Sequence, residues 1–315
     1  MEQPKVSIII PCYNSEAFLA ETLQSCINQQ YSNIEIVVVD DGSTDGSLKI
    51  AKQWEKQHTN IHVYAQSNNG ACRARNLALE KCTGDYIMYL DADDIISADK
   101  VASQMSIFSN THDPMAVVTC SFEEFVNSFP QKINRRINYK DYPHPIDLLI
   151  DIWSTGGMFP VSCYLISRKM AEIVGAWDER LLKNQDGDYF SRVLMIASKV
   201  YFSHKGFFFY RRGHASQSTV KINSEPKLRS VLLSYQKQKD ILKIEDSQRV
   251  RQALSRNFSL VLNSAKFGSE IYEEALKEIK TLGQNPQIIN PSVPVRIFTN
   301  LFGTELFLRI KSWIK

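Results

Sequence analysis

Short hydrophobic runs alternate with amphipathic segments through the first 125 residues of the chain. The runs show no strict polar and apolar alternation, which is typical of parallel strands buried on both faces of a sheet. They predict strands over Val6–Ile10, Ile34–Val39, Ile61–Tyr64, Tyr86–Leu90 and Ala116–Thr119. Between them, apolar residues at helical spacing predict helices over Ser15–Gln29, Thr44–Gln57, Ala71–Lys81 and Ala98–Asn110, with Ser15 and Thr44 as N-caps. This order predicts an α/β fold with an open, mostly parallel sheet, flanking helices and right-handed crossovers.

The pattern of apolar and charged residues changes at two places in the rest of the chain. A further apolar run covers Val200–Tyr210, and from about residue 224 the pattern becomes helical and more charged, including a predicted helix over Ser247–Lys266. We therefore expect a helical appendage after the α/β part. A proline-rich break at Pro286, Pro291 and Pro294 then precedes the C-terminal tail.

Polar residues follow three of the predicted strands at the point where each strand ends. They are Pro11–Asn14, Asp40–Ser43 and Asp91–Asp94. In open parallel sheets, ligands bind beyond the carboxyl ends of the strands. We expect these three segments to converge on one edge of the sheet.

Asp91-Ala92-Asp93 has the composition of a site for a hard cation. Mg²⁺ and Mn²⁺ prefer carboxylate oxygens and complete their coordination with water and substrate phosphates, so one or two Asp suffice. A lone D-x-D more often only caps the next helix. Asp41 is placed to accept a hydrogen bond from N3 of a uracil base, and Tyr13 offers a ring for stacking. Each alone is a turn or rim residue, but together with the D-x-D they predict a base pocket beside a phosphate site.

Composition excludes several classes of protein. With 315 residues, of which 43% are hydrophobic and 23% charged, the chain has ample material for a core. A net charge of +3 without charge blocks does not indicate a nucleic-acid surface. The six cysteines form no C-x-x-C pair, and we interpret them as reduced thiols in cytosol. No signal peptide is evident, and the longest uncharged stretch, Ile152–Ser167, is shorter than the roughly 20 apolar residues of a membrane span.

The motifs resemble those of glycosyltransferase family 2. The matching blocks are Val6–Asn14, Val37–Asp45, Asn69–Gly70 with Ala74–Asn76, and Thr83–Tyr86 leading into Asp91–Asp94. A looser resemblance to the acceptor-side half of the family continues through Gly156–Ser162, Ile166–Arg168, Val174–Glu179, Gln185–Asp188 and Tyr210–His214. The resemblance implies the GT-A fold, a nucleotide-sugar donor and inversion at the anomeric carbon.

The resemblance also implies a role for particular residues. It assigns nucleotide binding to Pro11, Tyr13, Asp41, Arg75 and Asp91, and metal binding to Asp93, Asp91 and His214. By position Asp186 corresponds to the catalytic base, with Gln185 where the family often has Glu. The implied reaction moves a sugar to an acceptor hydroxyl of a glycan or lipid-linked glycan and uses Mg²⁺ or Mn²⁺. Asp41 favours UDP as the nucleotide of the donor. We expect a GT-A catalytic domain over residues 1–220 (nucleotide-binding half 1–100, acceptor-side half 101–220), a helical appendage over 221–290 and a basic amphipathic tail over 291–315.

Alternatives stay open at this point. Asp188 is available as the nucleophile of a retaining route. The fold also suits a protein that binds nucleotide sugars without turnover, or a nucleotidyltransferase, although the latter predicts a glycine-rich phosphate loop where Pro11–Asn14 stands. Arg75 suits pairing with the acidic cluster, contact with a diphosphate, or a structural salt bridge. Trp153 and Trp177 are interpreted as core residues.

The tail has two interpretations. On a helical wheel, Phe298, Phe302, Leu306, Ile310 and Trp313 share one half, and the segment is basic. Such a helix suits peripheral contact with a membrane through residues 293–315, at the cytoplasmic face. It equally suits docking onto the protein's own core.

Overall fold

The structure of the protein is a computed structural model that describes residues 3–126, 136–155, 159–213, 224–242, 247–289 and 291–314. Its contacts divide the chain into two compact units. Unit 1 comprises Met1–Leu148, Met158–Glu179 and Arg192–Ser216, and unit 2 comprises Leu149–Gly157, Arg180–Ser191 and Gln217–Lys315. The division of the chain at residues 220 and 290 stays a prediction.

Unit 1 contains a five-stranded sheet in the order β3-β2-β1-β4-β7. The strands are β1 Val6–Cys12, β2 Ile34–Asp40, β3 Ile61–Ala65, β4 Tyr86–Tyr89 and β7 Ile166–Ser167. The first four are parallel and only β7 runs antiparallel, which confirms the predicted mostly parallel, open sheet. All seven residues of β2 are buried, as expected for a strand covered on both faces.

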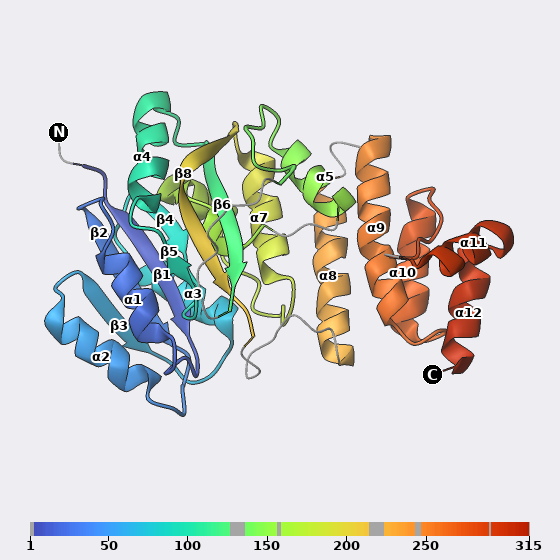
Figure 1. The fold of residues 1–315 in the computed structure, drawn as a ribbon, viewed down its shortest axis with the longest axis horizontal. Coiled ribbons are helices and arrows are strands. Elements are labelled where there is room, and N and C mark those ends of the chain that lie inside the picture. Colours follow the sequence, from blue (N-terminus) through green and yellow to red (C-terminus); the bar gives the residue numbers. More distant parts are fainter. Residues whose placement is uncertain are drawn as a thin grey trace. The chain divides into compact units, whose positions relative to one another are not determined.

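Helices cover both faces of this sheet. They are α1 Leu19–Ile27, α2 Ser47–Gln57 and α3 Ala71–Lys81. Helices α1 and α2 lie on one face and α3 on the other (Figure 1), as right-handed crossovers require when the chain first moves outward to β3 and then returns to β4. The carboxyl ends of β1, β2 and β4 therefore lie side by side.

A second, three-stranded sheet completes unit 1. It has the order β5-β8-β6, with β5 Ile95–Ile96, β6 Val117–Phe125 and β8 Val200–Arg211. β6 and β8 are parallel, and β8 pairs antiparallel with β5. Helix α4, Lys100–Thr111, packs against β8 and β6, and α6, Arg168–Val174, follows β7. The apolar run over Val200–Tyr210 is thus a strand whose carboxyl end lies beside the residues that follow β4.

Two predicted helix starts are wrong. α1 begins at Leu19 and α2 at Ser47, so Ser15 and Thr44 are not N-caps. The Ser15 amide instead donates to Ser47 Oγ at 2.7 Å, and the Thr44 amide donates to Asn14 Oδ1 at 2.8 Å. These polar residues join the loops after β1 and β2, because side chains with this chemistry bond whichever backbone groups lie nearest.

The buried Glu35 carboxylate joins β1, β2 and the turn before β4 at the amino ends of these strands. It accepts hydrogen bonds from Ser7 Oγ at 2.5 Å, from the Thr83 amide and from the Gly84 amide at 2.7 Å. A Cβ at Gly84 would lie 2.4 Å from Ser7 Oγ, so only glycine allows this approach. Burial acts to raise the pKa of Glu35, but the hydrogen bonds from Ser7, Thr83 and Gly84 outweigh it and lower the pKa below its ordinary value.

Unit 2 is helical. Its helices are α8 Glu225–Ile241, α9 Gln248–Ser264, α10 Glu270–Thr281, α11 Val293–Phe302 and α12 Thr304–Ile314, with the end of α5 (Ile146–Thr155) and the start of α7 (Gln185–Ile196). α9 packs between α8 and α10 (Figure 1). The predicted core positions of Trp153 and Trp177, in units 2 and 1, are confirmed because both side chains are buried.

The C-terminal tail forms two helices where the wheel analysis treats one. Gly303, at a φ of 85°, separates α11 from α12. Leu308 is buried, whereas Leu301 and Leu306 are 70% and 42% exposed. No described helix is both long and apolar enough to cross a bilayer.

The substitution Glu35→Gln tests the importance of the buried carboxylate. We expect it to reduce the free energy of unfolding by about 2–3 kcal/mol at pH 7, because an amide cannot accept all of these hydrogen bonds. A carboxyl with a lowered pKa contributes stability above its unfolded pKa near 4.5, and this contribution is lost as pH falls through the folded pKa. The difference from wild type in urea unfolding should therefore shrink below pH 4.5.

Glu172→Gln is the matched control, because Glu172 is exposed on α6. It should change the unfolding midpoint little at any pH. A Glu35→Gln protein as stable as this control at pH 7 would contradict the assignment.

Candidate functional site

The carboxyl ends of three neighbouring strands bring the predicted site residues of unit 1 together. Cys12 pairs with Asp40 across β1 and β2, and the Asp41 amide donates to the Cys12 carbonyl at 2.8 Å. On the other side of β1, the Leu90 amide donates to the Ile9 carbonyl at 2.9 Å. Tyr13, Asp41 and Asp91 therefore follow adjacent strands at one edge of the sheet.

Asp41 organises the loop between β3 and α3. Its carboxylate is buried and accepts hydrogen bonds from Gln66 Nε2 at 2.7 Å and from the amides of Asn69 and Gly70, both at 2.8 Å. An ionised carboxylate has about four lone-pair positions. Three protein donors leave room for one further donor, such as a base N–H.

Pro11 and Tyr13 border the same edge. Pro11 is the sixth residue of β1 and is half-buried, as expected of a strand residue near the sheet's edge. The Tyr13 side chain is 41% exposed, so part of its ring faces outward. An exposed aromatic ring offers a face on which a planar group can stack.

Arg75 connects α3 to the turn after β4. Its Nη2 lies 2.9 Å from Asp91 Oδ1, and its guanidinium lies 4.6 Å from the centre of the Trp177 ring. The Arg75 side chain is only 8% exposed. A cation stacked on a buried indole and paired with a carboxylate is held in one orientation.

The turn after β4 crowds three carboxylates into four residues. Burial and the neighbouring Asp91 carboxylate raise the pKa of Asp93 to about 7. Burial, followed by the charges of Asp93 and Asp91, raises the pKa of Asp94 well above its ordinary value. The acidic turn, Asp91–Asp94, therefore concentrates negative charge that is poorly solvated.

Arg211, the last residue of β8, contacts this acidic turn, a contact that was not predicted although the Tyr210–His214 motif includes this residue. Its amide donates to Asp94 Oδ1 at 2.8 Å, its Nε donates to the Asp93 carbonyl at 2.7 Å, and its Nη2 lies 2.5 Å from Glu21 Oε2. The available signal was a basic residue directly after an apolar strand, the same kind of position that identified the acidic segments. His214, predicted as a metal contact, lies outside the described residues.

The acidic turn fits a hard divalent cation. Among the described residues, no group hydrogen-bonds to the buried Asp94 Oδ2. Burial and the charge of Asp91 raise the pKa of Asp93 more than its backbone hydrogen bond and Arg211 lower it, so a further cation would stabilise the ionised form. A donor set made only of carboxylate oxygens suits Mg²⁺ or Mn²⁺. No cluster of three or more His, Cys, Asp or Glu with ligand geometry occurs among the described residues, so substrate and water would have to complete the coordination.

Asp186 and Asp188 belong to unit 2, on the first turn of α7. Asp186 is half-buried. The Asp188 side chain is 1% exposed, and its Oδ1 lies 2.8 Å from Lys237 Nζ. A carboxylate buried in an ion pair does not suit a nucleophile, which must face the sugar.

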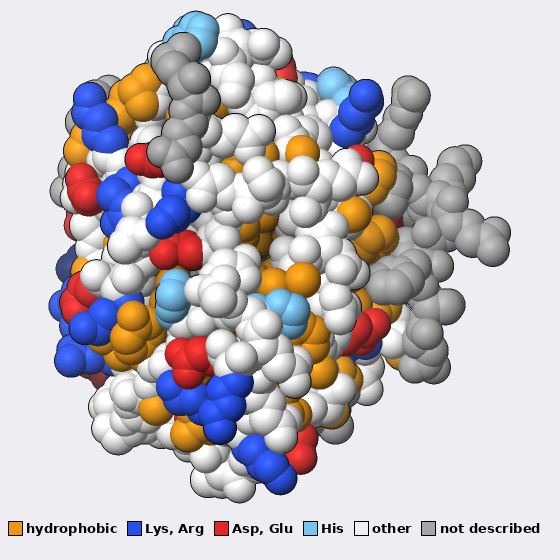
Figure 2. Space-filling view, turned by 90° about the vertical axis from the view of Figure 1, so that its left-hand side faces the viewer, with side chains coloured by type: hydrophobic (Ala, Val, Ile, Leu, Met, Phe, Trp, Pro, Cys, Tyr) orange, Lys and Arg blue, Asp and Glu red, His pale blue; other side chains and the backbone are white. Residues whose placement is uncertain are grey.

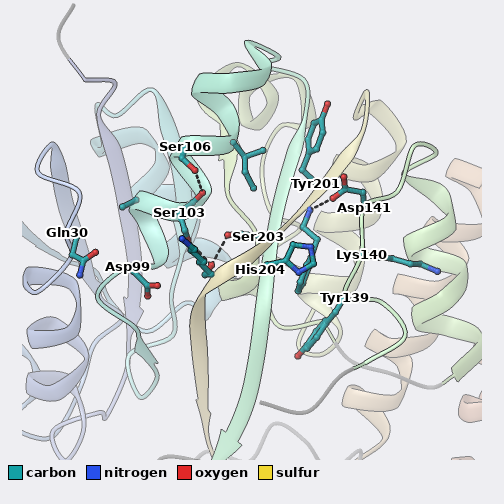
Figure 3. A pocket seen from close by; sticks show the side chains of 14 residues that line it. Gln30, Asp99, Ser103, Ser106, Tyr139, Lys140, Asp141, Tyr201, Ser203 and His204 are labelled. Atoms are coloured by element: carbon teal, nitrogen blue, oxygen red, sulfur yellow. Dashed lines mark hydrogen bonds between the residues drawn. The ribbon is translucent and has the colours of Figure 1, made fainter. Parts of the chain in front are cut away.

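A cavity of about 810 Å³ lies elsewhere in unit 1. Figure 3 shows its wall formed by Ser103 and Ser106 of α4, by His204 near the start of β8, and by Tyr139 and Asp141. Arg211 and the acidic turn are at the other end of β8. None of the predicted site residues lines this cavity.

The surface on the side of α2 and β3 carries charges of both signs. Figure 2 shows Lys and Arg side chains interspersed with Asp and Glu, and hydrophobic side chains around a hollow near the middle of the view. This face therefore presents no extended field of one sign.

Comparison with known proteins agrees with this geometry. The family described as Glycosyl transferase family 2 matches residues 7–217. An uncharacterised glycosyltransferase of Haemophilus influenzae is 31% identical over 228 residues, which are 71% of this chain and 86% of that protein. The putative teichuronic acid biosynthesis glycosyltransferase TuaG of Bacillus subtilis is 42% identical over 104 residues, 33% of this chain and 41% of the relative.

Solved structures show the same fold. Staphylococcus aureus TarS 1–349 in complex with UDP-GlcNAc has a TM-score of 0.63 at 16% identity, over 91% of this chain and 95% of that one. The mannosyltransferase PcManGT of Pyrobaculum calidifontis, in complex with GDP-Man and Mn²⁺, has a TM-score of 0.56 at 18% identity, over 99% and 88%. At these identities the likeness establishes the GT-A fold alone.

Arg75→Lys tests whether the guanidinium is specifically required. We expect a loss of about 1–3 kcal/mol in the free energy of unfolding, because an ammonium group cannot reproduce both the stacking on Trp177 and the directed bond to Asp91. Urea unfolding at pH 7 measures the loss. Arg73→Lys on the same helix is the control, since the Arg73 side chain is 57% exposed and its pair with Glu179 should contribute little. Equal midpoints for the two variants would refute the interpretation.

Proposed function

We propose that this chain, which belongs to glycosyl transferase family 2, moves a sugar from a UDP-sugar to an acceptor hydroxyl with inversion and requires a divalent cation. Membership makes it a nucleotide-sugar-dependent glycosyltransferase of an inverting family. One observation carries the finer proposal: Asp41 and the acidic turn follow β2 and β4, on either side of β1, and Arg75 of α3 pairs with Asp91 of that turn.

The donor side uses residues of unit 1. Asp41 is proposed to accept N3–H of uracil, and Tyr13 and Pro11 to border the base. Arg75 is proposed to reach the diphosphate from its place beside Asp91. UDP is also the nucleotide in the complex of the structural neighbour TarS. A thymine nucleotide offers the same N3 donor, so a nucleotide screen has to compare the two.

Asp93 and Asp91 are the residues proposed to hold Mg²⁺ or Mn²⁺. The fold neighbour PcManGT was solved with Mn²⁺. When bound, the cation supplies positive charge that stabilises the charge developing on the leaving diphosphate. His214 stays a predicted further contact.

Asp186 is the proposed general base. It takes the proton of the acceptor hydroxyl as that oxygen forms its bond to the anomeric carbon, while the bond from that carbon to the diphosphate breaks and UDP leaves with the electron pair. A single displacement inverts the anomeric carbon. The burial of Asp188 against Lys237 argues against the retaining alternative.

The acceptor is proposed to be a growing glycan or a lipid-linked glycan. TuaG, which matches the first part of the chain, is named for teichuronic acid biosynthesis. Peripheral contact with the cytoplasmic face of a membrane through residues 293–315 would bring the enzyme to such an acceptor. The exposed Leu301 and Leu306 on either side of Gly303 support this contact, and the sequence there is basic.

A screen of UDP-, dTDP- and GDP-sugars for Mn²⁺-dependent release of the nucleotide, with water as acceptor, tests the proposal. We expect a UDP-sugar to be hydrolysed fastest and Asp186→Asn to lower kcat by about a hundredfold or more. UDP affinity measured by calorimetry should stay unchanged. Asp186→Asn with full turnover would exclude the base assignment, and a wild-type protein that binds UDP-sugars without any turnover would favour the non-catalytic alternative.

Leu301→Asp combined with Leu306→Asp tests the membrane contact. We expect co-sedimentation with phosphatidylglycerol-containing liposomes to fall severalfold, because two negative charges replace two exposed leucine side chains. Ile173→Asp is the control, since Ile173 is 56% exposed on α6 of unit 1. Equal liposome binding by both variants would rule out the contact and favour docking of the tail on its own core.

A further inference from the structure

One face of α8 contacts the segment that carries Asp186. Ser230, Ser234 and Lys237 are spaced by four and three residues, so they lie on the same side of the helix. All three contact residues between Leu182 and Asp188, and all of these residues belong to unit 2. The helix that the sequence presents as an appendage therefore touches the proposed catalytic segment.

Ser230 bonds the backbone before α7. Its Oγ accepts hydrogen bonds from the amides of Leu182 and Lys183, both at 2.9 Å, and donates to the Lys183 carbonyl at 2.9 Å. A hydroxyl has one donor and two acceptor positions, so this side chain is fully used. Its 5% exposure means that water does not replace these bonds easily.

Ser234 repeats this pattern one turn later. It donates to the Asn184 carbonyl at 3.1 Å and accepts from Asn184 Nδ2 at 2.9 Å. Asn184 has a φ of 58°, the left-handed region that few residues other than glycine and asparagine adopt. A Cβ at Gly187 would lie 2.5 Å from Asn184 Oδ1, so the asparagine is fixed between α8 and the first turn of α7.

Lys237 completes the contact on the other side of Asp186. Its ammonium forms the buried ion pair with Asp188, two residues beyond the proposed base. Asp186 is therefore bracketed by Asn184 and Asp188, both attached to α8. Burial and the charge of Asp186 raise the pKa of Tyr235, also on α8, to about 12, while Arg256 of α9 acts in the opposite direction. The Asp186 charge therefore lies near the same helix.

We propose that α8 positions the catalytic base, and that Lys237 is a positioning residue that fixes the turn of Asp186 and neutralises Asp188 beside it. The inference rests on the proposed role of Asp186. Among the described residues, the charged and titratable groups in or near this turn include Lys183 within it, Lys237 and Tyr235 of α8, Arg256 of α9, and Asp186 and Asp188 of α7. Lys237 offsets the like charge that would otherwise act on Asp186.

Lys237→Met in the full-length protein is the main test, with the best UDP-sugar of the screen as donor, Mn²⁺, and water as acceptor. We expect kcat to fall about tenfold to a hundredfold, since a small displacement of a catalytic group has effects of this size. The dissociation constant of UDP should change less than about twofold, because the donor residues are in unit 1. The acidic limb of the kcat–pH profile should move upward by about one pH unit, because the unpaired Asp188 charge disfavours ionised Asp186.

Two further variants separate positioning from general stability. Lys237→Arg keeps the ion pair and should recover most of kcat. The double variant Asp188→Asn with Lys237→Met removes both charges, so its pH profile should return toward wild type even if kcat stays low. Arg229→Met is the control on the same helix, because Arg229 pairs with Glu270 and Glu225 away from the turn; it should keep the wild-type kcat.

The outcomes distinguish this inference from the proposed function. If Asp186→Asn is inactive while Lys237→Met matches wild type, the role of α8 is wrong and the proposed function stands. The role of α8 is equally wrong if Lys237→Met loses kcat only in proportion to its loss of folded protein, with an unmoved pH profile. If Asp186→Asn keeps full turnover, both are overturned.

Discussion

Negative charge concentrated in the acidic turn after β4 is the constraint around which unit 1 is arranged. Three carboxylates within four residues repel one another, and burial disfavours the ionised forms of Asp93 and Asp94, so cations nearby are favourable. Arg75 arrives from α3 and Arg211 from the end of β8. Both positions depend on topology: α3 returns the chain to β4, and β8 pairs with β5 immediately after the turn. The carboxylate oxygens of this turn are the kind of ligand that a hard divalent cation prefers.

The residues proposed to bind the donor and the proposed catalytic base are held in place in two different ways. Asp41 and Asp91, which are proposed to bind the donor, follow strands of a parallel sheet that are held in register by backbone hydrogen bonds. Asp186 lies in the first turn of α7, and the loop before this helix is hydrogen-bonded to serine side chains of α8. The hydrogen bonds of the sheet hold a strand end in place, whereas the backbone polar groups of a loop need other partners. This difference explains why α8 carries buried serines and a lysine that pairs with the buried Asp188.

Much of the fold was predictable, and the errors have physical causes. Continuous apolar runs located the four parallel strands, because burial on both faces requires such runs. They missed the short antiparallel β7, and the run over Ala116–Thr119 belongs to β6 of the second sheet. The same reasoning failed at Ser15 and Thr44, whose partners lie about thirty residues away in sequence. It also treated the tail as one helix, although Gly303 at positive φ separates two. At Ser15 and Thr44, contacts distant in sequence decided the outcome, whereas in the tail a single glycine broke the helical pattern.

The sequence by itself determined the family, the parallel sheet and the residues at its strand ends, because these follow from periodicity and from short motifs that are contiguous in the chain. Only the tertiary structure decided the second sheet, the arginine side chains that contact the acidic turn, and the hydrogen bonds and ion pair that join the Asp186 turn to α8. Arg211 and Glu21 are 190 residues apart, and Ser230 lies 48 residues from Leu182. Pairings of this kind depend on the three-dimensional path of the backbone, which no local pattern of residues specifies.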